Sequence, residues 1–163
     1  MILSLIKDRI KLSKKSVDIN PDKISTSETQ ELINNMTETL SHYALQIGAR
    51  GISACQVGEY KNIIVIKKFR LLNLYDTYIN LKILETHGKQ KSVEGCLSLP
   101  GILLSVNRPA RIKILYYDQN GKIHKKTVWG ALASIIDHEH DHTIGKTIID
   151  RYLEEIKEVE SER

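Results

Sequence analysis

The sequence predicts an α+β fold, with antiparallel sheets packed around a late helix that carries an H-E-x-x-H motif. Three observations lead to this fold class. A helical pattern occupies 25–47, β-branched and alternating runs fill the middle of the chain, and a second helical pattern begins near Ala131. Helices and strands segregated along the chain in this way are typical of α+β domains. With 163 residues the chain is long enough for one domain and short for two, so we expect a single domain over 1–163.

The first part of the chain is expected to lead into a long helix. Residues 1–6 are apolar but too few for a secretion signal or a membrane span, so we expect a first strand or an extended edge segment. Residues 11–24 are polar and irregular. Ser25 and Glu28 fit a capping box, apolar residues then recur at helical spacing, and Gly48 is well placed to end the helix.

The middle of the chain predicts strands at 62–66, 78–84 and 111–117, which are β-branched or alternating runs. The sequence Asp118-Gln119-Asn120-Gly121 predicts a hairpin turn, because Asn-Gly supplies the positive φ angles that tight turns need. The returning strand is expected at 122–129.

The end of the chain predicts a second helix from about Ala131, with Gly145 as a plausible stop, and then an acidic tail. Residues 151–163 hold five acidic and three basic residues, a net charge of −2. We expect this tail to be a short exposed helix or a frayed end.

Composition excludes several classes of function. Hydrophobic residues make up 41% of the chain and charged residues 27%, which is ordinary for a soluble protein. The net charge of +4 is mild and its basic residues are scattered, so we expect no specific nucleic-acid binding and no membrane binding. Without an export signal, the two cysteines are not expected to form a disulfide, and the protein is expected in the cytoplasm.

The late helix carries the sequence His138-Glu139-His140-Asp141-His142. Residues four apart share one helix face, so His138 and His142 can bind one metal ion while Glu139 reaches a water beside it. The alternative is a polar helix face with chance histidines, but the motif interrupts an apolar segment and holds three of the six histidines. His140 faces elsewhere and is expected at the surface or in support of a ligand. Asp141 either orients a ligand imidazole or is solvated, and both options stay open.

A catalytic site of this type needs a third protein ligand and leaves a fourth position for water. No histidine follows His142, and the later glutamates lie in the acidic tail, so the third ligand is expected upstream. Cys55 and Cys96 are the candidates, and neither spacing nor polarity decides between them.

Three segments taken together resemble the motifs of the peptide deformylase family. E-G-C-L-S stands intact at 94–98 and H-E-x-D-H at 138–142. G-x-G-x-A-A-x-Q stands in part at 49–56, where Ala49 replaces the first glycine and Ser53 replaces an alanine. The likeness runs from about residue 25 to residue 151.

The resemblance implies an activity and a division of roles. The family removes the formyl group from N-formyl-methionyl nascent peptides and releases formate. By the resemblance, Cys96 joins His138 and His142 as the third ligand, and Glu139 is the acid/base. The side-chain amide of Gln56 and the backbone N–H of Leu97 would stabilise the oxygen that becomes negative. Cys55 would be a small packed residue.

The same resemblance implies which residues surround the site. Glu94 and Arg108 would form a buried pair next to the ligands, with Asp141 also in a supporting position. Residues that would bind the substrate backbone or its methionine side chain are Ala49, Arg50, Gly51, Glu94, Gly95, Ala131, Ser134 and Ile135.

The resemblance further implies one divalent metal ion per chain, Fe²⁺ in the cell, with Zn²⁺ or Ni²⁺ able to occupy the site. A thiolate–imidazole set suits these ions better than Mg²⁺ or Ca²⁺. Some relatives dock on ribosomes through a basic C-terminal helix, whereas the tail here is acidic, which leaves a transient ribosome contact as the expectation.

Two alternatives remain beside a deformylase. A metallopeptidase of another type is disfavoured because no third ligand follows His142. A relative that binds formyl peptides without turnover is disfavoured by the intact Glu139, since a purely structural metal site has no use for a base.

Overall fold

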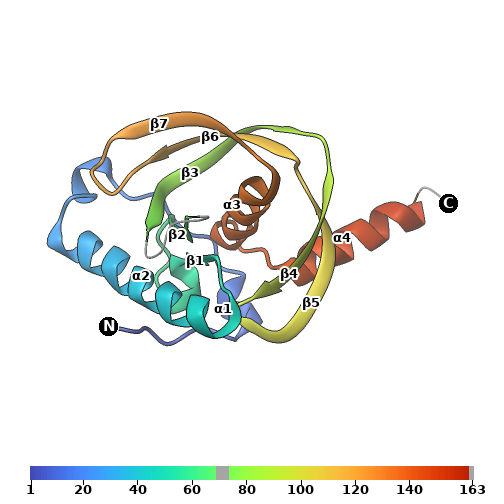
Figure 1. Cartoon of the computed structure of the whole chain (residues 1–163), viewed down its shortest axis with the longest axis horizontal. Helices are drawn as coiled ribbons and strands as arrows, with labels where there is room; N and C mark the ends of the chain where they lie inside the picture. The colour runs from blue at the N-terminus through green and yellow to red at the C-terminus, as the bar shows by residue number, and fades with distance from the viewer. Residues whose placement is uncertain (69–73, 162–163) are drawn as a thin grey trace.

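A computed structural model describes residues 1–68 and 74–161 of the chain. Most of its strands form an antiparallel sheet in the order β1-β2-β3-β6-β7, and the other two pair separately as a β4-β5 hairpin (Figure 1). The five strands of the large sheet are β1 (Gly51–Ser53), β2 (Ile63–Lys67), β3 (Tyr75–His87), β6 (Arg111–Tyr117) and β7 (Ile123–Trp129). The hairpin consists of β4 (Gln90–Cys96) and β5 (Leu99–Arg108).

Four α-helices accompany the strands in the described residues. They are α1 (Arg9–Leu12), α2 (Ser27–Ile47), α3 (Gly130–Thr143) and α4 (Ile148–Ser161), and short 3₁₀ helices lie at Pro21–Lys23 and Ala54–Val57. Figure 1 shows α3 enclosed between the large sheet and the β4-β5 hairpin, while α4 projects from the body of the molecule. The predicted α+β class, with sheets around a late helix, is confirmed.

Strand β2 is buried on both faces of the large sheet, which explains its uninterrupted apolar run. Ile63 and Val65 face α2, where they pack in a cluster with Met36. Their neighbours Ile64 and Ile66 belong to the opposite cluster, together with residues of α3. A strand covered on both faces needs apolar side chains at every position, because successive side chains point to opposite faces. This packing fixes α3 against the sheet and so fixes the site that α3 carries.

The predicted start of the first long helix is wrong. Thr26, not Ser25, is the N-cap residue, and no side chain bonds the first turn there. The Glu28 carboxylate instead accepts a hydrogen bond of 2.9 Å from Lys61, so tertiary pairing replaces the capping box. Gly48 ends the helix as predicted, at φ 71°, where a side chain would be strained.

The predicted strands at 62–66, 111–117 and 122–129 agree with β2, β6 and β7 to within a residue at each end. The run 78–84 belongs to a longer strand, β3. The 118–121 turn is held by the Asp118 carboxylate, which accepts from the backbone N–H groups of Asn120 and Lys122, and in it only Gly121 has positive φ.

Two further predictions concern the ends of the chain. Residues 1–6 are extended without belonging to a strand, and the backbone N–H of Ile6 donates to the Gln56 carbonyl at 2.7 Å. The acidic tail begins in a regular helix, α4, whose outer part is exposed, whereas Arg151 is tied to the interior. Residues 162 and 163 of the predicted tail lie outside the described residues. None of the helices in the described ranges is long and apolar enough to span a bilayer.

Candidate active site

The two motif histidines lie on one face of α3, as their spacing of four residues requires. Their ring centroids are 5.1 Å apart, and both side chains are buried. Helix α3 holds them rigidly because apolar residues on its other face, such as Ile136, pack against the large sheet. His140 points away from this pair and is only half-buried.

Cys96 reaches the histidines from the end of β4, where the register with β5 shifts after Glu94. The Cys96 Sγ atom lies 3.3 Å from His142 Nε2. The ligand atoms of Cys96, His138 and His142 all lie within 4.8 Å of one another, and no other such group occurs among residues 1–68 and 74–161. These three residues come from two elements far apart in the sequence and converge in the fold.

Cys55 is placed differently, although it lies nearby. Its side chain is fully buried, and its Sγ donates to the backbone carbonyl of His142 at 3.4 Å. Burial raises the pKa of the Cys55 thiol to about 12, so the thiol stays protonated at neutral pH. A metal ligand must be a thiolate, and this environment disfavours one.

The residues present fit a transition-metal ion. The Nδ1 atom of His138 lies 2.8 Å from a carboxylate oxygen of Glu94, an arrangement that orients the ring and leaves Nε2 for an ion. Burial lowers the pKa of His142 well below its usual value, which keeps this imidazole neutral, as a ligand must be. One sulfur and two imidazole nitrogens suit Zn²⁺, Fe²⁺ or Ni²⁺ rather than a hard ion such as Mg²⁺.

Glu139 is buried beside these ligands and faces β1. One of its carboxylate oxygens accepts a hydrogen bond of 2.8 Å from the hydroxyl of Ser53. Burial raises the pKa of Glu139 above its usual value. A carboxyl group with a raised pKa is suited to taking and returning a proton near neutral pH.

Gln56 is held with its amide group turned towards the same place. Its Oε1 accepts from the backbone N–H of Ser53 at 2.9 Å, so its Nε2 faces the site. That Nε2 lies 3.5 Å from Cys96 Sγ and 3.2 Å from the hydroxyl of Ser98. Leu97 follows in the turn between β4 and β5, and both Gln56 and Leu97 line the cavity beside Cys96.

A buried network of charges supports the ligand helix. Arg108 donates to Glu94 at 2.8 and 3.0 Å, to Asp137 at 2.9 Å and to Asp141 at 2.5 Å. Burial alone would raise the pKa of Glu94, but hydrogen bonds with His138 and Arg108 outweigh it and lower that pKa to about 2. Asp141 therefore neither orients an imidazole nor is solvated; it pairs with arginines, and Glu94 contacts the imidazole of His138.

Arg151 completes this network from α4. Its guanidinium donates to Asp141 at 2.6 and 3.1 Å and to Asp137 at 3.2 Å. Sequence reasoning missed Asp137 and Arg151. The spacing of Asp137 and Asp141 could have indicated this network, since two like charges four residues apart on a buried helix face need cationic partners.

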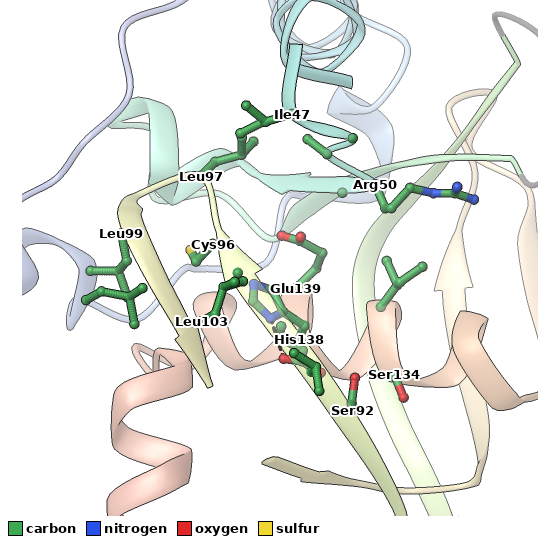
Figure 2. A pocket seen from close by; sticks show the side chains of 18 of the residues that line it. Ile47, Arg50, Ser92, Cys96, Leu97, Leu99, Leu103, Ser134, His138 and Glu139 are labelled. Atoms are coloured by element: carbon green, nitrogen blue, oxygen red, sulfur yellow. Dashed lines mark hydrogen bonds and ion pairs between the residues drawn. The ribbon is translucent and has the colours of Figure 1, made fainter. Parts of the chain in front are cut away.

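A cavity of about 860 Å³ opens in front of the ligands (Figure 2). β1, the outermost strand of the large sheet, flanks it on one side and β4 flanks it on the other. The Arg50 side chain points away from Glu139 (Figure 2). All eight residues that the resemblance assigns to the substrate line this cavity: Ala49, Arg50, Gly51, Glu94, Gly95, Ala131, Ser134 and Ile135.

Comparison with known proteins agrees with this geometry. The sequence model of the family described as polypeptide deformylase matches residues 2–158. A peptide deformylase of Stenotrophomonas maltophilia is 35% identical over 147 residues, which cover 90% of this chain and 84% of that protein. The crystal structure of peptide deformylase from Thermotoga maritima superposes with a TM-score of 0.82 at 30% identity, over 93% of this chain and 97% of that one. A Synechococcus elongatus peptide deformylase, solved in complex with actinonin, gives a TM-score of 0.80 at 34% identity, over 92% and 78% of the two chains.

An α+β fold around a Cys–His–His cluster with a neighbouring buried glutamate defines a metal-dependent hydrolase. The chain belongs to the peptide deformylase family. It is a hydrolase that acts on the N-formyl group of formyl-methionyl peptides, and this excludes a metallopeptidase of another type.

Proposed function

We propose that this chain removes the formyl group from N-formyl-methionyl nascent peptides, with Cys96, His138 and His142 holding one divalent metal ion and Glu139 acting as acid/base. The observation that carries the proposal is the convergence of these three ligand atoms within 4.8 Å beside a buried glutamate. Hydrolysis of an amide needs an activated water, a stabilised oxyanion and a proton for the leaving amine. Each of these needs has a candidate group at this site.

The ion is proposed to be Fe²⁺ in the cell, and Zn²⁺ or Ni²⁺ can occupy the same ligands. A divalent ion supplies Lewis acidity when bound, which makes hydroxide available at neutral pH. The thiolate of Cys96 donates charge to the site and selects soft or borderline ions. Glu94 supports the site by orienting the His138 ring at 2.8 Å, while Arg108 and Asp141 hold Glu94 and α3 in place.

Glu139 takes a proton from the attacking water and passes it to the amine that leaves. Its burial favours this role because burial raises the pKa of the carboxyl group and so makes the carboxylate a better proton acceptor. The amide N–H₂ of Gln56 and the backbone N–H of Leu97 donate to the formyl oxygen as that oxygen becomes negative. The hydrogen bond from Ser53 to Gln56 preorganises the amide for this purpose.

The peptide is proposed to bind as an added strand beside β1 and β4. β1 is only three residues long and is an edge strand of its sheet, and its first residue, Gly51, lines the cavity. Main-chain groups of Ala49, Arg50 and Gly51 on one side, and of Glu94 and Gly95 on the other, would pair with an extended peptide. The methionine side chain would lie against the wall formed by Ala131, Ser134 and Ile135.

The substrate also suggests where the enzyme works. Formylated N-termini emerge on nascent chains, so we place the activity in the cytoplasm with at most a transient contact to the ribosome. The described part of the tail, 151–161, has four acidic residues against two basic ones, which does not favour stable docking on ribosomal RNA.

The test is formate release from a formyl-Met-Ala-Ser peptide by protein loaded with Fe²⁺ or Ni²⁺. We expect formate and free peptide in equal amounts, and no cleavage of the same peptide without its formyl group. Cleavage at internal peptide bonds would contradict the proposal. Saturable binding of the formylated peptide by metal-loaded protein without formate release would identify a binding protein instead.

A further inference from the structure

The carboxyl group of Glu139 is hydrogen-bonded to the side chain of Ser53 on β1. The hydroxyl oxygen of Ser53 lies 2.8 Å from Glu139 Oε2 and 2.9 Å from the Glu139 backbone carbonyl oxygen. The Ser53 side chain is fully buried, so water does not compete for these contacts. A hydrogen bond to a carboxylate in such surroundings is stronger than one in water.

Gly51 makes the close approach between β1 and Glu139 sterically feasible. A Cβ atom at this position would lie 2.6 Å from Glu139 Oε1 and 2.9 Å from its Cδ. The backbone of β1 therefore contacts the carboxyl group directly, and two residues further along the same strand Ser53 supplies the hydrogen bond. The two positions together leave the carboxyl group little room to move.

Ser53 also contacts the other candidate catalytic side chain. Its backbone N–H donates to Gln56 Oε1 at 2.9 Å, while its hydroxyl bonds Glu139. One buried residue thus connects the proposed oxyanion donor with the proposed acid/base.

We propose that Ser53 is a positioning residue that holds the Glu139 carboxyl group in a fixed place beside the metal ligands. The inference rests on the proposed role of Glu139. The Ser53 hydroxyl donates its proton to Oε2 of the carboxylate, and Gly51 allows the β1 backbone to approach the same group closely. No proton is gained or lost by Ser53.

The decisive variants are Ser53→Ala, Ser53→Thr, Glu139→Ala and the double variant Ser53→Ala/Glu139→Ala, measured as nickel-loaded protein for kcat, KM and metal content. Ser16→Ala is the matched control, because the Ser16 hydroxyl is also buried but has no hydrogen-bond partner among the described residues. We expect Ser53→Ala to lower kcat by roughly tenfold, as the loss of one hydrogen bond to a carboxylate implies, with KM and metal content unchanged. Ser53→Thr keeps the hydroxyl and is expected to retain more of kcat than Ser53→Ala.

The double variant separates positioning from general structural support. If Ser53 acts through the Glu139 carboxyl group, Ser53→Ala should change the residual rate of Glu139→Ala less than twofold. The unfolding midpoint of the metal-free proteins gives a second readout, in which the two substitutions should also be non-additive. Should Ser53→Ala not fold, Ser53→Cys replaces it, since a thiol of similar size is a weaker donor.

Three results would decide against the inference or its basis. Full activity of Ser53→Ala, equal to that of Ser16→Ala, would remove the role of Ser53. An equal loss of kcat with and without Glu139 would show a structural effect that does not act through this carboxyl group. Full activity of Glu139→Ala would instead contradict the proposed function, which keeps the two failures apart.

Discussion

Cys96 and Cys55 have the same side chain, yet their surroundings give them different chemistry. Cys96 lies at the cavity, with its Sγ atom 3.3 Å from His142 Nε2 and 3.5 Å from the side-chain Nε2 of Gln56, so it can share an ion with the histidines. Cys55 is sealed in the core and its pKa is raised to about 12 by burial. Spacing and polarity could not separate them, because the separation depends on where β4 brings its last residue, and only the family motif at 94–98 indicated Cys96.

The cysteines can be separated experimentally by substituting each with serine. We expect Cys96→Ser to lose Co²⁺, Fe²⁺ and Ni²⁺, because a neutral hydroxyl replaces a soft thiolate. Cys55→Ser should keep the metal and lose at most about 1 kcal/mol of stability. The thiolate-to-cobalt charge-transfer band of the cobalt protein reports the result. A band that survives in the Cys96 variant and vanishes in the Cys55 variant would reverse the assignment.

Glu139 provides a second prediction at this scale. Glu139→Gln should keep about one metal ion per chain while kcat falls by roughly 10²–10⁴-fold, the usual cost of removing a general base. The reason is that Glu139 contacts Ser53 and lies outside the Cys96–His138–His142 cluster. Metal analysis checks the metal content, and single-turnover formate release checks the fall in rate. Loss of the metal in this variant would show that Glu139 is itself a ligand.

At the scale of elements, α3 and the β6-β7 hairpin were predictable because their own sequences define them. Residues 111–117 alternate in burial along the whole strand, and the histidine spacing needs only a helix. β4 and β5 were not predicted, since β4 is largely polar and β5 contains Pro100 and Gly101. The start of α4 did carry a signal that was missed: Thr147 and Asp150 have the spacing of a capping box, and Asp150 accepts from the Thr147 N–H at 2.9 Å.

The start of α4 leads to a pH prediction. Burial raises the pKa of Asp150, but hydrogen bonds from Thr147 and the charge of Arg9 outweigh it and lower this pKa. A carboxyl group with a depressed folded-state pKa stabilises the fold above its unfolded value of about 3.9, and this contribution is lost as the pH falls further. Asp150→Ala should therefore cost about 1 kcal/mol at pH 7, the usual cost of a lost cap.

Chemical unfolding of metal-free protein at several pH values tests the Asp150 prediction. The difference between the parent and Asp150→Ala should be constant from pH 7 to about pH 5 and shrink below about pH 3.9. A difference that grows towards acid pH would contradict the sign of the argument.

Arg151 connects α4 with α3, the helix that carries the two histidines. Its removal should therefore weaken metal retention as well as the stability of the fold. Arg151→Met leaves Asp137 and Asp141 with Arg108 as their one cationic partner in the described part of the chain, so we expect a loss of about 1–3 kcal/mol in unfolding free energy. Lys157→Met on the exposed part of the same helix is the control. If the Arg151 variant loses nickel to a chelator faster than the Lys157 variant does, the network holds the metal ligands in position. If the two variants lose nickel at equal rates, Arg151 contributes only to the stability of the fold.

For the whole molecule, the cavity follows from the arrangement of two sheets around one helix. β1 contributes the glycine and serine that contact Glu139, β4 contributes the thiol, and α3 contributes the imidazoles. The thiol and the imidazoles could be identified from sequence because each lies within a short local motif. The ion network and the Ser53 contact arise from tertiary packing between segments that share no sequence pattern. That residues 1–163 form one domain stays a prediction.

The order of the network along the chain predicts a specific effect of proteolysis between α3 and α4. Lys146 lies in the turn between α3 and α4, after all three ligands and before Arg151. A single cut there by a lysine-specific protease would spare every metal ligand and every proposed catalytic group. It would, however, leave α4, and with it the Arg151 guanidinium that pairs with Asp137 and Asp141, held by noncovalent contacts alone. Protein cut at this turn should therefore lose activity faster during storage than uncut protein, although the peptide that carries the three ligands is intact.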